Sequence, residues 1–275
     1  MHIRYGFDIG LSLMQPTTIL TLMDVHSDDR VGIVEETELQ LSRPIPWARI
    51  VDRHGNVMRR LFADAGPLSL CHDGVFHTDR REDAVDRTAE TVAVWDLPPD
   101  ALHFLLPSRY CETDLLSDFA WTNFGAIPGG WAKVQAICDF VHERLAFDYA
   151  HARPTRTASE ALAEGVGVCR DFTHLAVALC RCLNIPARYC NGYLGDIGVP
   201  PNPSPMDFNA WFEAYLGGRW FTFDPRHNRP RIGRILIARG RDAADIPMIT
   251  TFGSHALTRF TVVTKEIEDS AALAA

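Results

Sequence analysis

Hydrophobic and polar residues follow two different periods in the two parts of the chain. Up to about residue 108, the apolar runs are short and are separated by turn signals, which is typical of β-strands. These runs cover residues 19–23, 38–41, 48–52, 57–61 and 91–95. The turn signal Arg-His-Gly-Asn at 53–56 lies between two of them. No helical period is sustained here, so the pattern predicts an antiparallel β-sandwich.

From about residue 109 the period becomes helical. Predicted helices cover residues 115–124, 134–145 and 159–164, and a further helix begins at Cys169 and ends near Asn184, before Pro186. Predicted strands then cover residues 187–193, 210–216 and 219–224. Gly217-Gly218 is a two-residue hairpin turn between the last two strands. The tail, residues 269–275, is expected to be frayed.

These patterns predict an α+β protein with two domains. Residues 1–108 form the N-terminal antiparallel β-sandwich, and residues 109–275 form a core of helices packed on an antiparallel sheet. A chain of 275 residues with 47% hydrophobic content is long enough to bury the cores of both.

Composition excludes some function classes and favours a compartment. A net charge of -8 argues against a nucleic-acid partner. No run approaches the ~18 apolar residues of a membrane span, so no membrane association is expected, and the first ten residues do not resemble a signal peptide. Seven cysteines form an odd number without a disulfide framework. Reduced thiols in a cytoplasmic protein are therefore expected.

The cysteine and histidine spacings do not indicate a metal site. Residues 71–73 and 77 (Cys-His-Asp and His) match no familiar ligand pattern. Cys180 and Cys182 lie about 200° apart around a helix axis, so they cannot bind one ion together. Both are expected to pack in the core. We expect neither a metal nor another cofactor.

Cys169 is the candidate nucleophile. It follows the glycine-rich segment 165–168 and lies in the first turn of a predicted helix. Unpaired backbone N–H groups and the helix dipole favour the thiolate in that position. Catalysis by a cysteine also needs a base and a group that orients the base. The sheet that follows ends in a carboxylate, Asp224.

Four motifs in this order resemble the core of the bacterial transglutaminase-like superfamily, which is often described as containing cysteine proteases. They are Gly-Val-Cys-Arg-Asp-Phe at 167–172, Ile-Pro-Ala-Arg-Tyr at 185–189 with Asn-Gly-Tyr at 191–193, Ala-Trp-Phe-Glu-Ala-Tyr at 210–215, and Trp-Phe-Thr-Phe-Asp-Pro at 220–225. The resemblance covers about residues 130–264. It implies a papain-like, transglutaminase-like core with a Cys-His-Asp triad.

The resemblance assigns the triad cysteine to Cys169 and the aspartate to Asp224. The family's histidine normally precedes Ala-Trp, and this chain has Asn209 there. If Gly217-Gly218 form the whole hairpin turn, Trp211 faces Asp224, and Asn209 is its diagonal neighbour on the same face. The geometry of the site is therefore kept, but an amide cannot accept the thiol proton at neutral pH.

His227 is the candidate replacement for the missing base. If Pro225 ends the strand, a loop could fold His227 back toward the thiol; if the strand continued, His227 would point to the opposite face. A structural hydrogen bond within the loop is the alternative role. His174 lies five residues after Cys169 on one helix and is expected to point away from it.

Two further residues are candidates for substrate binding. Trp211 shares the face of Asp224, where it could stack on a substrate or pack in the core. Arg226 begins an arginine-rich segment with residues 229, 231, 234, 239 and 241. Arginines bind carboxylates and phosphates in a bidentate manner, so this segment could recognise an anionic substrate end. The alternative is ion pairing with the protein's own acids.

Two functions fit this pattern. In the first, Cys169 attacks a peptide or carboxamide carbonyl to form a thioester, its backbone N–H stabilises the oxyanion, and water or an amine resolves the thioester. This enzyme would act on a peptide or protein substrate. In the second, Asn209 leaves a catalytically impaired pseudoenzyme that binds a peptide or protein. The oligomeric state stays open.

Overall fold

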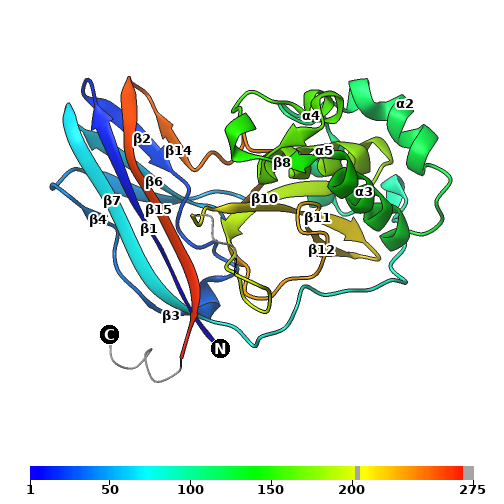
Figure 1. The fold of residues 1–275 in the computed structure, drawn as a ribbon, viewed down its shortest axis with the longest axis horizontal. Helices are drawn as coiled ribbons and strands as arrows, with labels where there is room; N and C mark the ends of the chain where they lie inside the picture. Colours follow the sequence, from blue (N-terminus) through cyan, green and yellow to red (C-terminus); the bar gives the residue numbers. More distant parts are fainter. Residues whose placement is uncertain (202–204, 269–275) are drawn as a thin grey trace.

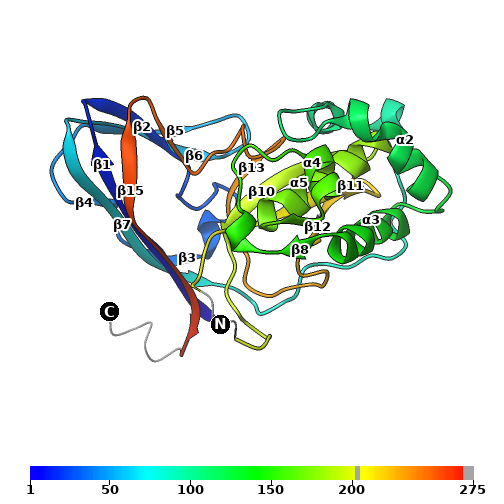
Figure 2. The ribbon, with the colours of Figure 1, turned by 45° about the horizontal axis from the view of Figure 1, so that its top comes forward.

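The computed structural model describes residues 1–201 and 205–268, so the tail that was expected to fray lies outside the described residues. The chain forms a β-sandwich lobe and a second lobe in which helices pack on a sheet (Figures 1 and 2). The predicted α+β class is therefore confirmed, including the strand-rich N-terminal lobe.

Two antiparallel sheets form the sandwich. The first has the order β15-β1-β7-β3, with β4 also paired to β7, and the second has the order β14-β2-β6-β5. The first sheet contains β1 (His2–Leu13), β3 (Ile33–Glu36), β4 (Gln40–Leu41), β7 (Gly66–His77) and β15 (His255–Ile267). The second contains β2 (Thr17–Thr21), β5 (Trp47–Val51), β6 (Val57–Ala63) and β14 (Ile249–Thr251). Alternate residues of β1 enter the core, because side chains on a strand alternate between faces.

The last two strands of the chain belong to the sandwich. β15 pairs with β1 along its whole length, and β14 pairs with β2. The predicted boundary at residue 108 assigns both strands to the second domain. Pairing between segments about 250 residues apart leaves no local signal in the sequence. The sandwich lobe therefore combines the two ends of the chain.

The second lobe contains a sheet with the order β12-β11-β10-β13. Its strands are β10 (Ala187–Tyr193), β11 (Asn209–Leu216), β12 (Arg219–Phe223) and β13 (Ile235–Gly240). The helices are α1 (Pro99–Leu102), α2 (Thr113–Phe124), α3 (Trp131–Arg144), α4 (Ala158–Glu164) and α5 (Cys169–Cys182). β8 (Ala146–Phe147) and β9 (Val166–Gly167) form a short parallel pair. No helix among the described residues is both long and apolar enough to span a membrane.

Helix α5 is buried along almost its whole length. Every residue from Asp171 to Cys182 is buried, and Leu175 and Leu179 join one hydrophobic cluster with Phe212 of β11. Cys180 and Cys182 lie in the same cluster, as predicted. Asn184 has a positive φ of 59°, which ends the helical path before Pro186. The nucleophile therefore begins a helix that is fixed by the core on all sides.

The prediction of a strand at 91–95 is wrong. Residues 94–96 form a short 3-10 helix, η2 (Val94–Asp96), and residues 91–93 form no strand. This segment belongs to the linker between the lobes, and Trp95 is 95% exposed. Residues 91–95 alternate as in a strand, but this segment lies beside no partner strand among the described residues, so its apolar side chains remain on the surface.

One hydrophobic cluster spans the two lobes, beside the separate cluster that contains α5. A single cluster joins Ile3 and Tyr5 of β1 to Tyr189 and Tyr193 of β10. The rings of Tyr5 and Tyr193 meet edge to face, with centroids 5.2 Å apart. The sandwich therefore supports β10, the strand that lies beside β11 in the second lobe.

Replacing Leu179 by alanine should destabilise the protein strongly. Leu179 is fully buried, so its truncation leaves a cavity and should lower the free energy of unfolding by about 2–5 kcal/mol. Leu115→Ala is the matched control: Leu115 is 64% exposed, and the change should stay within about 0.5 kcal/mol. Urea denaturation followed by circular dichroism measures both. Equal effects of the two substitutions would contradict the central place of α5 in the core.

Candidate active site

A tight turn presents Cys169 at the start of α5. Helix α4 ends at Gly165, whose φ of 70° lies in the left-handed region. At Gly167, a Cβ atom would lie 2.7 Å from the Cβ of Asp171, so a side chain there does not fit. Cys169 itself is partly exposed. The predicted position of Cys169 in the first turn of a helix is correct.

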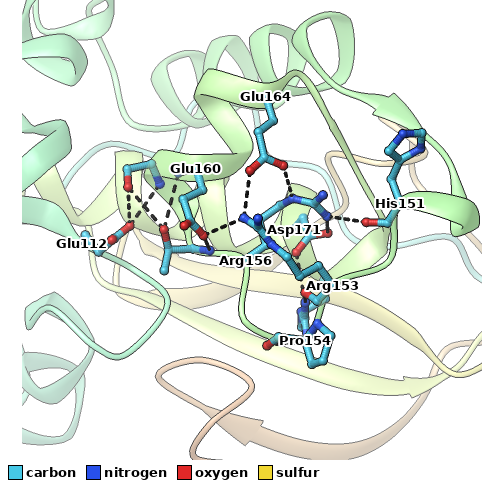
Figure 3. A network of polar contacts seen from close by, with 11 residues as sticks. Glu112, His151, Arg153, Pro154, Arg156, Glu160, Glu164 and Asp171 are labelled. Atoms are coloured by element: carbon cyan, nitrogen blue, oxygen red, sulfur yellow. Dashed lines mark hydrogen bonds and ion pairs between the residues drawn. The ribbon is translucent and has the colours of Figure 1, made fainter.

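A buried ion pair fixes this turn (Figure 3). Asp171 Oδ2 accepts hydrogen bonds from the backbone N–H of Val168, at 2.9 Å, and from Arg156, at 3.0 Å. Arg156 also donates to Glu164 of α4, at 2.9 Å. Because Asp171 and Arg156 are 1% and 3% exposed, each needs the other as a charge partner. Asp171 thus holds the start of α5 and, through Arg156, links it to α4.

The β11–β12 hairpin has the predicted register. Leu216 lies opposite Arg219, and Phe212 lies opposite Phe223, so Gly217-Gly218 form the whole turn. Beyond the paired residues, Arg226 donates to Asn209 Oδ1 at 3.0 Å. The Asn209 amide nitrogen donates to the carbonyls of Leu194 and Asp207. Both the oxygen and the nitrogen of the Asn209 amide are therefore hydrogen-bonded, and none of these partners is a histidine.

Asp224 and His227 form a hydrogen-bonded pair. His227 Nδ1 lies 2.8 Å from Asp224 Oδ2, and the His227 backbone N–H donates to Asp224 Oδ1 at 3.1 Å. Burial alone would raise the pKa of Asp224, but Arg234 and His227 outweigh burial and hold this pKa well below its usual value. Because the carboxylate can only accept, His227 Nδ1 is the donor in this pair, and in a neutral ring Nε2 is then the acceptor.

The strand ends at Phe223, and a turn folds His227 back to Asp224. The Asn228 backbone N–H donates to the Asp224 carbonyl at 2.7 Å, and Asn228 has a positive φ of 50°. This is the loop arrangement considered for His227, in contrast to a continued strand. No hydrogen bond joins the His227 ring to the Cys169 sulfur in the part of the chain that the structure describes.

A cation, Arg226, and a carboxyl group, Asp207, are the charged groups with the largest influence on the Cys169 thiol. Burial raises the pKa of Cys169 to about 11. Arg226 lowers it, Asp207 raises it, and the backbone N–H of Ala210 donates to the sulfur. The pKa of Cys169 is therefore raised by burial, whereas the position at a helix start had predicted a lowered pKa. The resting group at neutral pH is the thiol.

A polar cavity joins several of these groups. Its lining includes Tyr149, Asp196, Asp207, Asn209, Arg226, His227 and Arg231. Sequence patterns missed Tyr149 and Asp207. Burial raises the pKa of Asp207, and burial likewise raises that of Tyr149 to about 12, while the two side chains hydrogen-bond each other. Asp207 lies two residues before Asn209, and residues two apart on a strand share a face. This spacing was the signal that could have identified Asp207.

Trp211 does not contact this cavity. It is 2% exposed, and the Arg234 guanidinium lies 4.8 Å from its ring centroid. The substrate-stacking role considered for Trp211 is therefore not supported, because the ring packs inside the protein. Arg226, in contrast, lines the cavity and lies 3.9 Å over the Phe147 ring.

The other arginines of the 226–241 segment mostly pair with the protein's own acids. Arg234 pairs with Asp83, Arg239 with Glu213, and Arg241 with Asp245. His174 is buried between the rings of Tyr110 and Tyr189, and its Nε2 accepts the Ala243 N–H. Among the described residues, no group of three or more potential ligands could hold a metal ion.

Comparisons with known proteins place the chain in a family. The family model described as "Transglutaminase-like superfamily" matches residues 124–225. An uncharacterized protein of Mycobacterium leprae is 32% identical over 233 residues, which are 78% of this chain and 79% of the relative. An uncharacterized protein of Mycobacterium tuberculosis is 33% identical over 241 residues, covering 70% of this chain and 74% of the relative.

A solved structure matches both lobes. The crystal structure named "Putative Cysteine Protease" from Cytophaga hutchinsonii has a TM-score of 0.86 and 33% sequence identity. The match covers 98% of this chain and 91% of that chain. The chain therefore belongs to the transglutaminase-like superfamily.

The pH dependence of the alkylation rate of Cys169 should show how burial and the neighbouring charges set the pKa of its thiol. Because iodoacetamide reacts with the thiolate, the rate should rise with pH and inflect near a pKa of about 11. Removing the cation in Arg226→Gln should move the inflection to higher pH, whereas removing the carboxylate in Asp207→Asn should move it to lower pH. Mass spectrometry of the Cys169 peptide follows the reaction. The Cys71 peptide, from the sandwich lobe, is the internal control. An inflection below ~8.5, the free-thiol value, would contradict this description.

Proposed function

We propose that the protein is a cysteine hydrolase or acyltransferase that acts on peptide or carboxamide bonds through a thioester on Cys169. The observation that carries the proposal is the hydrogen bond between Asp224 and His227, because it holds a ring that lines one cavity with Arg226 and Asn209. Membership of the transglutaminase-like superfamily supports the reaction class.

In this mechanism, His227 Nε2 accepts the Cys169 proton as the sulfur attacks the carbonyl carbon. Asp224 stabilises the imidazolium and fixes the tautomer. His227 then gives the proton to the leaving amine, and the C–N bond breaks to leave the thioester. Water or a second amine attacks the thioester, passes its proton to His227, and releases the Cys169 thiol. Because the ring and the sulfur are not hydrogen-bonded at rest, substrate binding has to bring them together.

The remaining site residues assist without transferring protons. Arg226 places a positive charge near the sulfur, which favours the thiolate as it forms. Asn209 holds Arg226 and the segment before β11 in place. The backbone N–H of Cys169, at the start of α5, is the candidate oxyanion donor.

We propose a peptide or protein as the substrate and the cytoplasm as the location. A thioester mechanism needs a free thiol, and all seven cysteines are free, which fits a reducing compartment. The net charge of -8 gives no support to a nucleic-acid partner.

The second candidate is a pseudoenzyme that binds a peptide or protein segment in the same cavity. Two observations favour it: Asn209 occupies the position of the family's histidine, and burial raises the pKa of Cys169. Under this proposal, Cys169 and Asp224 support the fold of the cavity and carry out no chemistry.

Substitutions at three positions separate the two candidates. A library of fluorogenic peptide amides reports amine release, and intact-protein mass spectrometry detects the acyl-enzyme. We expect activity in the natural protein, its loss in Cys169→Ala, and a fall in kcat/KM of about 10²–10⁴-fold in His227→Gln, because a general base is lost. His255→Gln, which changes an exposed histidine of β15, is the matched control and should retain full activity.

The substitution Asn209→His, which restores the family's histidine, tests the pseudoenzyme directly. If Asn209→His creates amidase activity that the natural protein lacks, the pseudoenzyme is correct and His227 is not the base. If the natural protein is active and Asn209→His does not increase its rate, the enzyme proposal stands.

A further inference from the structure

Residue Asp83 lies in the linker between the two lobes, outside every motif of the superfamily that the sequence contains. We propose that Asp83 is a positioning residue for the Asp224–His227 pair and acts on it through Arg234. The inference rests on the proposed function of this pair as the catalytic base. Figure 1 shows the linker running from β7 across to the far end of the second lobe.

Arg234 lies between two carboxylates inside the protein. Its Nε donates to both oxygens of Asp83, each at 3.0 Å, and its NH2 group donates to Asp224 Oδ2 at 2.9 Å. The Arg234 side chain is 8% exposed, and that of Asp224 is 1% exposed. A buried guanidinium needs compensating charge, and the two carboxylates provide it, one at Nε and the other at the NH2 group.

The backbone fixes Asp83 in this position. The Arg231 N–H donates to Asp83 Oδ2 at 2.9 Å, and the Asp83 N–H donates to the Arg231 carbonyl at 3.0 Å. The neighbouring Glu82 forms a β-bridge with Ile232. Asp83 therefore joins the linker to the segment that precedes β13, and its carboxylate has one defined orientation.

Arg234 and His227 bind the same oxygen of Asp224. Oδ2 accepts from Arg234 at 2.9 Å and lies 2.8 Å from His227 Nδ1. The two donors therefore share one negative charge. By pairing with Nε of Arg234, Asp83 limits how far the guanidinium neutralises Asp224. Without the Asp83 charge, the positive charge of Arg234 would be balanced by Asp224 alone. The Asp224 carboxylate would then stabilise the imidazolium of His227 less.

Several other charged or titratable groups face this pair from the surrounding elements. They are Arg226 in the same turn, Arg231 before β13, Asp196 and Asp207 in the segment between β10 and β11, Tyr149 in η4 (Tyr149–His151), Cys169 in α5, and Asp139 and His142 in α3. None of these donates to Asp224 Oδ2, and among the described residues only Arg234 connects Asp83 to that oxygen.

The titration of the His227 ring tests the proposal without requiring turnover. Histidine ring signals are followed by heteronuclear NMR between pH 4 and 9 in the full chain, and the spectrum of His227→Gln assigns the signal among the 11 histidines. In Asp83→Asn, we expect the titration midpoint of His227 to fall by about half to one pH unit, because the imidazolium loses stabilisation. Asp83→Glu, which restores the carboxylate, should return it toward the natural value.

Glu82→Gln is the matched control, since it removes one exposed carboxylate from the adjacent linker position. It should leave the midpoint unchanged. An unchanged midpoint in a folded Asp83→Asn protein, or an equal shift in Glu82→Gln, would overturn the proposal. Peptide-amide hydrolysis in the same variants keeps the two proposals apart. A shifted midpoint in a protein without any amidase activity would reject the proposed function but not the positioning by Asp83.

Discussion

The shared oxygen of Asp224 is the constraint on which the candidate site depends. A buried carboxylate is costly unless charges and hydrogen bonds compensate it. Here the compensation comes from Arg234 and from His227, which both bind Oδ2. This requirement fixes the end of β12, the turn that carries His227 and the segment before β13. It also couples the site to the linker, because Arg234 is itself compensated by Asp83.

The electrostatics of Cys169 show which effects prevail at the nucleophile. A charged group near a helix N-terminus typically gains about 0.3–1 kcal/mol. Burial nevertheless raises the pKa of Cys169 to about 11, and the Arg226 charge, which lowers this pKa, does not offset burial. A reaction at this thiol requires proton transfer during attack, in contrast to a thiolate that is already formed.

Much of the site was accessible from the sequence because its signals are local. The glycine-rich turn and the period of α5 predicted the start of the helix at Cys169, and the two-residue hairpin predicted the register of β11 and β12. The raised pKa of Cys169 was not predictable, since the atoms that bury it come from segments far apart in the chain. Asp83 and the β1–β15 pairing were missed for the same reason. Trp211 was ambiguous, because the alternation of a strand identifies a face but does not show whether that face is covered.

The position of His227 explains how an Asp-His pair can persist without the histidine of the family's strand. His227 reaches Asp224 from the same turn, three residues away along the chain. That turn is held by α3: Gln135 and Asp139 bind the side chain of Asn228. Arg226, in the same turn, donates a hydrogen bond to Asn209. The positions of the Arg226 cation and of the His227 ring are therefore two consequences of one local conformation, so they are expected to change together.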